Sequence, residues 1–244
     1  MVMHRVADGI HRLGSRHHNF YVVVAGEKAT VIDSGARKDY SQLVAGLISL
    51  GLGVDDVEVV LITHAHTDHM GSAAQAARAG VAVKGHEAEI PVLRGDRPVE
   101  QVKTSQLPLW KPGTWSFLVA MIRAGATGAP PIPGVESVVD GEVLDVPGRP
   151  QVVHTPGHTP GHAAYYLSDR QVLFSGDGLV TQSPIGGVKG PLLLDSRFQA
   201  DVAQARASLS LIAGLDTRLI LPGHGDPWAG QAADAVAAAL LPLP

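Results

Sequence analysis

Apolar residues along this chain follow two spacings, one typical of β-strands and one typical of helices. Short β-branched runs bounded by Gly, Asp or Ser indicate strands, and apolar residues three and four positions apart indicate helices. In the first 93 residues these patterns predict strands at 20–24, 29–32, 57–62 and 81–83, and helices at 40–48, 73–77 and 87–93.

The strand rhythm returns after Gly134. We predict strands at 135–139, 142–146, 151–154, 163–167, 171–175 and 218–221. A helix is predicted around Val202, Ala205, Leu209 and Ile212, and an Ala-rich helix closes the chain. Both halves run from strands to a helix, and we expect one domain over residues 1–244.

Residues 95–134 differ from the rest. They contain the prolines Pro98, Pro108, Pro112, Pro130, Pro131 and Pro133 and the bulky side chains Trp110, Trp115, Phe117 and Met121. A helix at 114–124 would be apolar on two sides, so both sides need a partner. We expect either a lid over a substrate site or an interface between copies of the chain, which leaves a homo-oligomer open.

Composition removes several classes of function. The net charge of −4 and the absence of a basic run argue against a nucleic-acid partner. No apolar run is long enough for a membrane span, and residues 1–8 lack the apolar core of a signal peptide, so we expect a cytoplasmic protein. Cysteine is absent, which excludes thiolate ligands and nucleophiles.

A cluster of potential metal ligands follows the strand at 57–62. His64, His66, Asp68 and His69 lie within six residues. Two imidazoles two positions apart project to the same side of an extended segment. Imidazole and carboxylate ligands at this spacing suit zinc. We therefore predict a metal site between a strand end and a helix start.

Other apolar runs also end in His or Asp beside glycine. These positions are Asp33, His158, Asp177 and His224. Ligands in α/β sheets bind beyond the carboxyl ends of strands, and glycine permits sharp turns there. If these strand ends share one rim, their side chains converge on the histidine cluster.

Taken together, the motifs resemble those of the metallo-β-lactamase superfamily. They are His64-x-His66-x-Asp68-His69, Thr155-Pro156-Gly157-His158-Thr159-Pro160-Gly161-His162, Ser175-Gly176-Asp177, Pro222-Gly223-His224 and the early Asp33. The resemblance implies an α/β fold, a four-layer αββα sandwich with a two-metal site on one edge. It assigns His64, His66 and His158 to one metal, Asp68, His69 and His224 to the other, and Asp177 to both.

The resemblance also implies a reaction. Two divalent ions, zinc with iron or manganese as substitutes, would share a hydroxide that attacks an ester-type carbonyl. Asp68 would orient that nucleophile and take its proton, while Asp33 and His162 would orient ligands. We expect a small-molecule substrate with an apolar or acyl part: a lactone, a thioester or another acyl ester, with a lactone as the narrower expectation.

Several alternatives stay open on sequence alone. A glyoxalase-II-like thioesterase shares the Thr-Pro-Gly-His-Thr-x-Gly-His motif, although Gly225-Asp226 replaces the expected Glu-Tyr. A mononuclear-iron dioxygenase of the persulfide-dioxygenase type shares much of the ligand set. A metal-stabilised binding module without turnover is the third.

Overall fold

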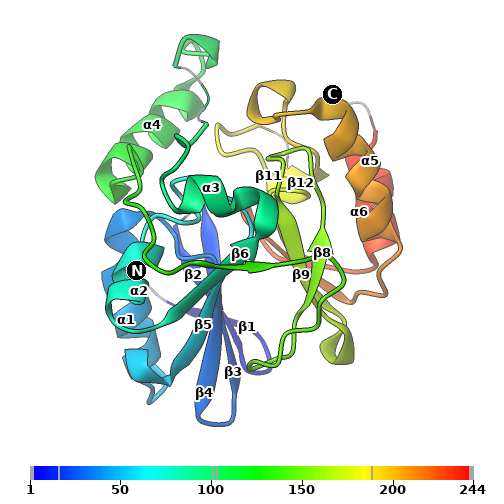
Figure 1. The fold of residues 1–244 in the computed structure, drawn as a ribbon. Coiled ribbons are helices and arrows are strands. Elements are labelled where there is room, and N and C mark those ends of the chain that lie inside the picture. The colour runs from blue at the N-terminus through cyan, green and yellow to red at the C-terminus, as the bar shows by residue number, and fades with distance from the viewer. Residues whose placement is uncertain (1–2, 16, 101, 103, 188, 242–244) are drawn as a thin grey trace.

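The chain forms two β-sheets packed face to face, each covered on its outer side by helices (Figure 1). The computed structural model describes residues 3–15, 17–100, 102, 104–187 and 189–241. Residues 101 and 103 of the predicted 95–134 insertion lie outside the described residues. The four layers are those of the αββα sandwich, and the predicted α/β class is confirmed.

The first sheet changes direction halfway across. Strands β1 to β4 pair antiparallel, and β4 to β7 pair parallel. In spatial order the strands are β1 His4–Ala7, β2 Ile10–Gly14, β3 Asn19–Ala25, β4 Lys28–Ile32, β5 Val57–Ile62, β6 Ala82–His86 and β7 Glu136–Val138.

The second sheet has the order β14-β13-β10-β9-β8. Its strands are β8 Gln151–His154, β9 Ala163–Leu167, β10 Val172–Gly176, β13 Leu219–Pro222 and β14 Trp228–Ala229. A separate two-stranded ribbon pairs β11 Val180–Gln182 with β12 Lys189–Leu192.

Helices close both outer faces (Figure 1). The first sheet is covered by α1 Tyr40–Ser49, α2 Ala73–Arg78 and α3 Ile90–Leu93; the second by α5 Val202–Ala213 and α6 Ala232–Ala239. Helix α4, Pro112–Ala124, stands at one end of the sandwich. Among the described residues, no helix combines the length and apolar character needed to cross a membrane.

Alternation along the strands builds the core. In β3, Tyr21 and Val23 face the second sheet, whereas Phe20 and Val22 pack under the helices. Strand β10 divides in the same way, with Phe174 between the sheets and Leu173 beneath α5 and α6. Because successive side chains point to opposite faces, one apolar strand serves two layers.

Hydrogen bonds join the two sheets at the edge where β5 and β13 end. The hydroxyl of Tyr165 donates to the Ile62 carbonyl at 3.0 Å, and that of Tyr21 donates to the Pro222 carbonyl at 2.7 Å. Backbone amides add two more ties: Ala163 donates to the Thr63 carbonyl and Asn19 to the Gly223 carbonyl. These bonds fix the loops that follow both strands.

Most predicted elements are confirmed, with boundaries shifted by up to three residues. The predicted strand at 142–146 is wrong: only Val143 forms an isolated bridge, to Gln151. The turn that follows contains Pro147 and Pro150, which lack an amide hydrogen, and Arg149 with a positive φ, so pairing stops early. Strands β1, β2, β11, β12 and β14 were not predicted, because they are short and partly polar.

One stacked pair of rings makes stability depend on pH. The rings of His86 and His154 stack with centroids 3.9 Å apart. Burial lowers the pKa of His86, and a positive charge on His154 lowers it further, while Glu87 and Asp140 act in the opposite direction. The folded protein therefore disfavours protonated His86. The stability that the neutral ring contributes is fully present above its ordinary pKa of 6.5, and the free energy of unfolding decreases as the pH falls below that value.

We predict that His86→Phe loses less thermal stability than the wild type between pH 7.5 and pH 5.5. The variant retains a flat ring but has no proton to bind. Thermal unfolding of the metal-loaded proteins at both pH values is the measurement, with His4→Phe at an exposed site as the control. An equal loss in wild type and His86→Phe would show that the stacked pair does not set this pH dependence.

Candidate metal centre

Four strands deliver the predicted ligands to one edge of the sandwich. The loop after β5 carries His64, His66, Asp68 and His69, and the loops after β8, β10 and β13 carry the other three predicted ligands, His158, Asp177 and His224. All of them fall into groups whose potential ligand atoms lie within 4.8 Å of one another. The structure thus brings together the full predicted set.

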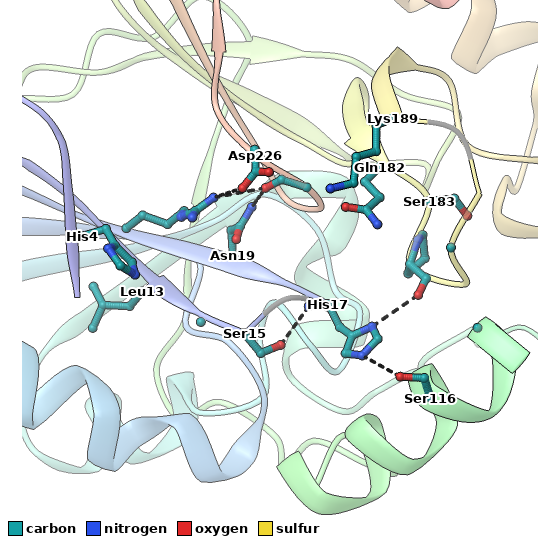
Figure 2. A pocket seen from close by; sticks show the side chains of 16 residues that line it. His4, Leu13, Ser15, His17, Asn19, Ser116, Gln182, Ser183, Lys189 and Asp226 are labelled. Atoms are coloured by element: carbon teal, nitrogen blue, oxygen red, sulfur yellow. Dashed lines mark hydrogen bonds and ion pairs between the residues drawn. The ribbon is translucent and has the colours of Figure 1, made fainter. Parts of the chain in front are cut away.

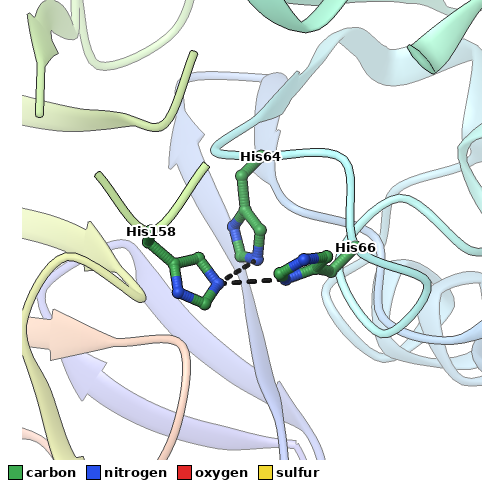
Figure 3. Close-up of side chains that lie close together, drawn as sticks. All are labelled: His64, His66 and His158. Atoms are coloured by element: carbon green, nitrogen blue, oxygen red, sulfur yellow. Dashed lines mark hydrogen bonds between the residues drawn. The ribbon is translucent and has the colours of Figure 1, made fainter. Parts of the chain in front are cut away.

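The first group consists of three imidazoles (Figure 3). The Nε2 atom of His158 lies 3.2 Å from Nε2 of His64 and 3.0 Å from Nδ1 of His66. Three ring nitrogens therefore converge on one small space. Their spacing suits one tetrahedral metal ion bound by three protein ligands.

The second group consists of Asp68, His69 and His224, and Asp177 lies between the two groups. Asp177 Oδ2 is 3.5 Å from His158 Nε2 and 3.0 Å from His224 Nε2. Its other oxygen, Oδ1, is 3.5 Å from His69 Nε2. One carboxylate thus reaches both groups. Glycine at position 223 permits this approach, because a Cβ there would lie 2.2 Å from Asp177 Oδ1.

Neighbouring groups fix the orientation of the imidazoles. Nδ1 of His64 lies 3.0 Å from the Thr63 hydroxyl, and Nδ1 of His69 lies 2.8 Å from Asp33 Oδ2. Nδ1 of His224 hydrogen-bonds to the carbonyl of His17. With Nδ1 engaged in each case, the Nε2 atoms point into the cluster.

Asp33 and His162 act from outside the cluster, as expected. Asp33 accepts hydrogen bonds from the amide and hydroxyl of Thr63, and its backbone has a φ of 59°, unusual for a residue other than glycine. Nε2 of His162 accepts from the amides of Asp177 and Gly178 at 3.0 and 3.1 Å. His162 therefore holds the loop that presents Asp177.

The electrostatics of the site favour a cation. Burial lowers the pKa values of His64 and His158 well below 6.5, so these rings are neutral at pH 7. Burial alone would also lower the pKa of His69, but nearby carboxylates outweigh it and raise this pKa to about 10. Among the described residues, the ion pairs of these carboxylates, Asp33, Asp68 and Asp177, are all with histidines.

Unpartnered atoms test whether the residues fit a metal. His69 Nε2 and Asp177 Oδ1 are buried and have no hydrogen-bond partner among the described residues. Leaving a buried polar atom without a partner costs about 1–3 kcal/mol. Metal coordination would satisfy both atoms and neutralise the buried carboxylates. The donor set of imidazoles and carboxylates fits zinc, iron or manganese.

Glu89 joins the two histidine loops, and sequence reasoning missed this role. Its side chain is buried, and its two oxygens accept from the amides of Ala65 and Gly161, each at 2.8 Å. Ala65 lies between His64 and His66, and Gly161 lies in the loop that carries His158. One carboxylate thus positions ligands from both sheets. An acidic residue just before the buried Ile90 was the available signal.

An apolar cavity of about 340 Å³ opens onto the cluster. Its floor includes His66, Asp68, His158, Asp177 and His224. Helix α4 supplies Phe117, Leu118, Met121 and Ile122 to the wall, and Leu194 and Phe198 face them. Trp110 and Trp115, which we grouped with Phe117 and Met121, are not among the lining residues and are exposed to solvent.

A polar cleft of about 560 Å³ lies beside this cavity (Figure 2). Pro184 lines both spaces, and His17 lines the cleft with Nδ1 3.3 Å from the Pro184 carbonyl and Nε2 3.5 Å from the Ser116 hydroxyl. The cleft contains the cations Arg12 and Lys189, and Arg12 pairs with Asp226 at 3.0 Å. The two spaces therefore meet at Pro184 but differ in chemistry.

Comparison with known proteins gives a consistent result. Residues 13–224 match the family model described as the metallo-beta-lactamase superfamily. The probable metallo-hydrolase YflN of Bacillus subtilis strain 168 is 28% identical over 240 residues, covering 90% of this chain and 80% of the relative. The acyl-coenzyme A thioesterase MBLAC2 of Bos taurus is 27% identical, covering 93% and 81%.

A solved structure shows the same architecture. The metallo-beta-lactamase family protein TTHA1429 from Thermus thermophilus superposes with a TM-score of 0.70 at 25% sequence identity. The match covers 96% of this chain and 80% of that protein.

We predict that Asp177→Asn lowers the affinity for metal first at the group formed by Asp68, His69 and His224. That group would keep one carboxylate, whereas the other keeps three imidazoles. Loss of the shared carboxylate should lower metal affinity by at least the roughly 10–100-fold typical of groups that only support a ligand. Elemental analysis and turnover beside wild type are the measurements. A variant that retains both metals and normal turnover would show that Asp177 is no ligand.

We also predict that Glu89→Gln lowers metal affinity about 10–100-fold. A glutamine has only one accepting oxygen, so one of the two loop amides loses its partner. Chelator competition on the purified protein measures the effect. The control is Glu87→Gln, an exposed carboxylate two positions away, which should behave as wild type. Unchanged metal affinity in Glu89→Gln would show that Glu89 does not position the ligands.

Proposed function

We propose that this chain, which belongs to the metallo-beta-lactamase superfamily, is a metal-dependent hydrolase of acyl esters: thioesters, lactones or other esters with an apolar acyl part. The observation that carries the proposal is the apolar cavity above the His/Asp cluster. Its floor supplies metal ligands and its walls are aliphatic and aromatic, so an acyl chain and its carbonyl fit the same space.

The metals would be held by the two groups described above. His64, His66 and His158 would hold one ion, Asp68, His69 and His224 the other, and Asp177 would contact both. When bound, such ions supply Lewis acidity and lower the pKa of water to about 7. Zinc fits the donor set, and iron or manganese fits it nearly as well.

Asp68 is the residue that we assign to proton transfer. Its side chain is 14% exposed and lines the cavity floor, with Oδ2 3.7 Å from His224 Nε2 and 4.0 Å from His69 Nε2. Burial alone would raise its pKa, but His69 and His224 outweigh this and lower it. An ionised carboxylate at the floor can accept a proton from water and return it to the leaving group.

The relatives and the second cavity favour a thioester over the lactone that we expected. The match to the relative named as an acyl-coenzyme A thioesterase covers 93% of this chain and 81% of that relative. The polar cleft, which shares Pro184 with the apolar cavity, also offers room for a large polar leaving group next to it. A lactone has no separate leaving group to place there.

We predict that Met121→Ala reduces kcat/KM for long acyl substrates about 10-fold and leaves acetyl substrates nearly unchanged. Loss of a buried apolar contact costs about 1–2 kcal/mol, and only long chains reach the wall. Val119→Ala on the outer side of α4 is the control. The assay is a chain-length series of soluble thioesters and esters, with lactones, phosphodiesters and β-lactams alongside, on protein of measured metal content.

Three results would contradict the proposal. Equal losses of kcat/KM at every chain length would show that the acyl chain does not bind in the cavity. Hydrolysis of none of these substrates would exclude an ester hydrolase. A single iron per chain with oxygen consumption would favour the mononuclear dioxygenase instead.

A further inference from the structure

Helix α4 exposes an apolar face that adjoins the side lining the cavity. Trp115, Val119 and Ile122 are 55%, 43% and 62% exposed. They lie four and three positions apart, so they form one stripe along the helix. A stripe of large apolar side chains in water is unfavourable unless a partner covers it.

The loop before α4 extends this stripe. Leu109 is 39% exposed and Trp110 is 81% exposed. The indole nitrogen of Trp115 donates to the Leu109 carbonyl at 2.8 Å, which joins loop and helix. We call Leu109, Trp110, Trp115, Val119 and Ile122 the α4 outer face. Among the described residues, both strongly exposed aromatic side chains belong to it, and the exposed apolar residues elsewhere are aliphatic.

The charge around the α4 outer face is positive. Residues 101–135 contain no Asp or Glu, although the whole chain has 23 and a net charge of −4. Lys111 and Arg123 flank the helix at its two ends. Arg37 and Lys38 pack against the turn after the helix, where a Cβ at Gly125 would lie 3.5 and 3.4 Å from them.

Asp39, the acid next to Arg37 and Lys38 in sequence, is paired elsewhere. The Asp39 carboxylate is turned inward, 2.6 Å from Nε2 of the buried His18, and also accepts from the Ala36 amide. The α4 outer face is therefore an apolar stripe with a basic border on an otherwise acidic protein. Basic borders and tryptophans are typical of helices that lie at anionic lipid surfaces.

The adjoining side of the same helix forms part of the wall of the apolar cavity. Phe117, Leu118 and Met121 face the cavity, and Ile122 both lines it and is exposed. The cavity mouth therefore lies at the edge of the α4 outer face. An acyl chain leaving a lipid surface that touches this face would meet the cavity without crossing bulk water.

We propose that the α4 outer face docks on an anionic lipid surface and takes up acyl substrate from it past Ile122. The substrate class would then be acyl esters or thioesters that partition into such surfaces, which rests on the proposed function. A second copy of the chain fits less well. Two such faces in contact would bring the cations Lys111 and Arg123 of each copy together.

The test uses the metal-loaded full chain and vesicles of phosphatidylcholine, with and without phosphatidylglycerol. Trp110 and Trp115 are two of the three tryptophans, and the third, Trp228, is partly buried. We expect a blue shift of tryptophan emission and co-sedimentation with the anionic vesicles, at least 10-fold tighter than with phosphatidylcholine alone. High salt should weaken binding to the anionic vesicles.

Variants locate the binding surface. Trp110→Ser combined with Trp115→Ser should weaken vesicle binding at least 10-fold, and Arg123→Glu should remove the preference for anionic lipid. Ile48→Ser is the control, because Ile48 is 66% exposed on α1, outside this face. Hydrolysis of soluble short-chain substrates should be unchanged in all of these variants.

The outcomes separate this proposal from the proposed function. Vesicle binding requires no turnover, so a wild-type protein that binds anionic vesicles but hydrolyses none of the ester substrates would overturn only the proposed function, and Asp177→Asn should bind the vesicles as the wild type does. No vesicle binding, or equal binding to neutral and anionic vesicles, would overturn the docking proposal. A dimer in solution that the tryptophan variants dissociate would assign the face to a second copy instead.

Discussion

The hydrogen bonds between the two sheets at one rim are the constraint on which the rest of this structure depends. Tyr165 reaches across to the end of β5, and Tyr21 reaches across to the end of β13. Burial raises the pKa of both hydroxyls, so they remain donors. These bonds therefore hold the ends of β5 and β13 in fixed positions relative to each other across the sandwich.

Charged side chains lie close together at this rim, and their charges need compensation. Carboxylates in the loops after β4, β5 and β10 surround imidazoles that burial keeps neutral or that carboxylates protonate. Such a cluster is costly without a cation or well-placed partners. Glu89 adds a further buried carboxylate, and two backbone amides satisfy it. Stability and ligand placement therefore depend on the same polar contacts.

The sequence revealed the elements whose patterns are local. Strands such as β5 are continuous apolar runs, and the ligand motif follows directly, so strand and candidate ligands could be predicted together. Strands β1 and β14 pair with their sequence neighbours β2 and β13, but β14 is too short and β1 too polar to show an apolar alternation. Glu89 was missed for a different reason: its two hydrogen-bond donors lie in loops far apart in sequence that come together only in the fold.

The insertion was predicted only in outline. Apolar residues on two sides of a helix at 114–124 indicated two contacts, but not which side faced which partner. The structure turns Phe117 and Met121 toward the cavity and Trp115 toward solvent. Trp110 could not be placed from periodicity, because it lies in the loop before the helix, where no 3.6-residue repeat applies.

The place of the insertion in the topology has an evolutionary consequence. The chain leaves the first sheet after β6 and returns at β7, its parallel neighbour, so residues 95–134 form part of a crossover connection. Parallel strands require a long connection in any case, and its length and content are nearly independent of their register. Descendants can therefore exchange this segment, and with it one wall of the apolar cavity, while the loops that carry the candidate ligands stay under separate selection.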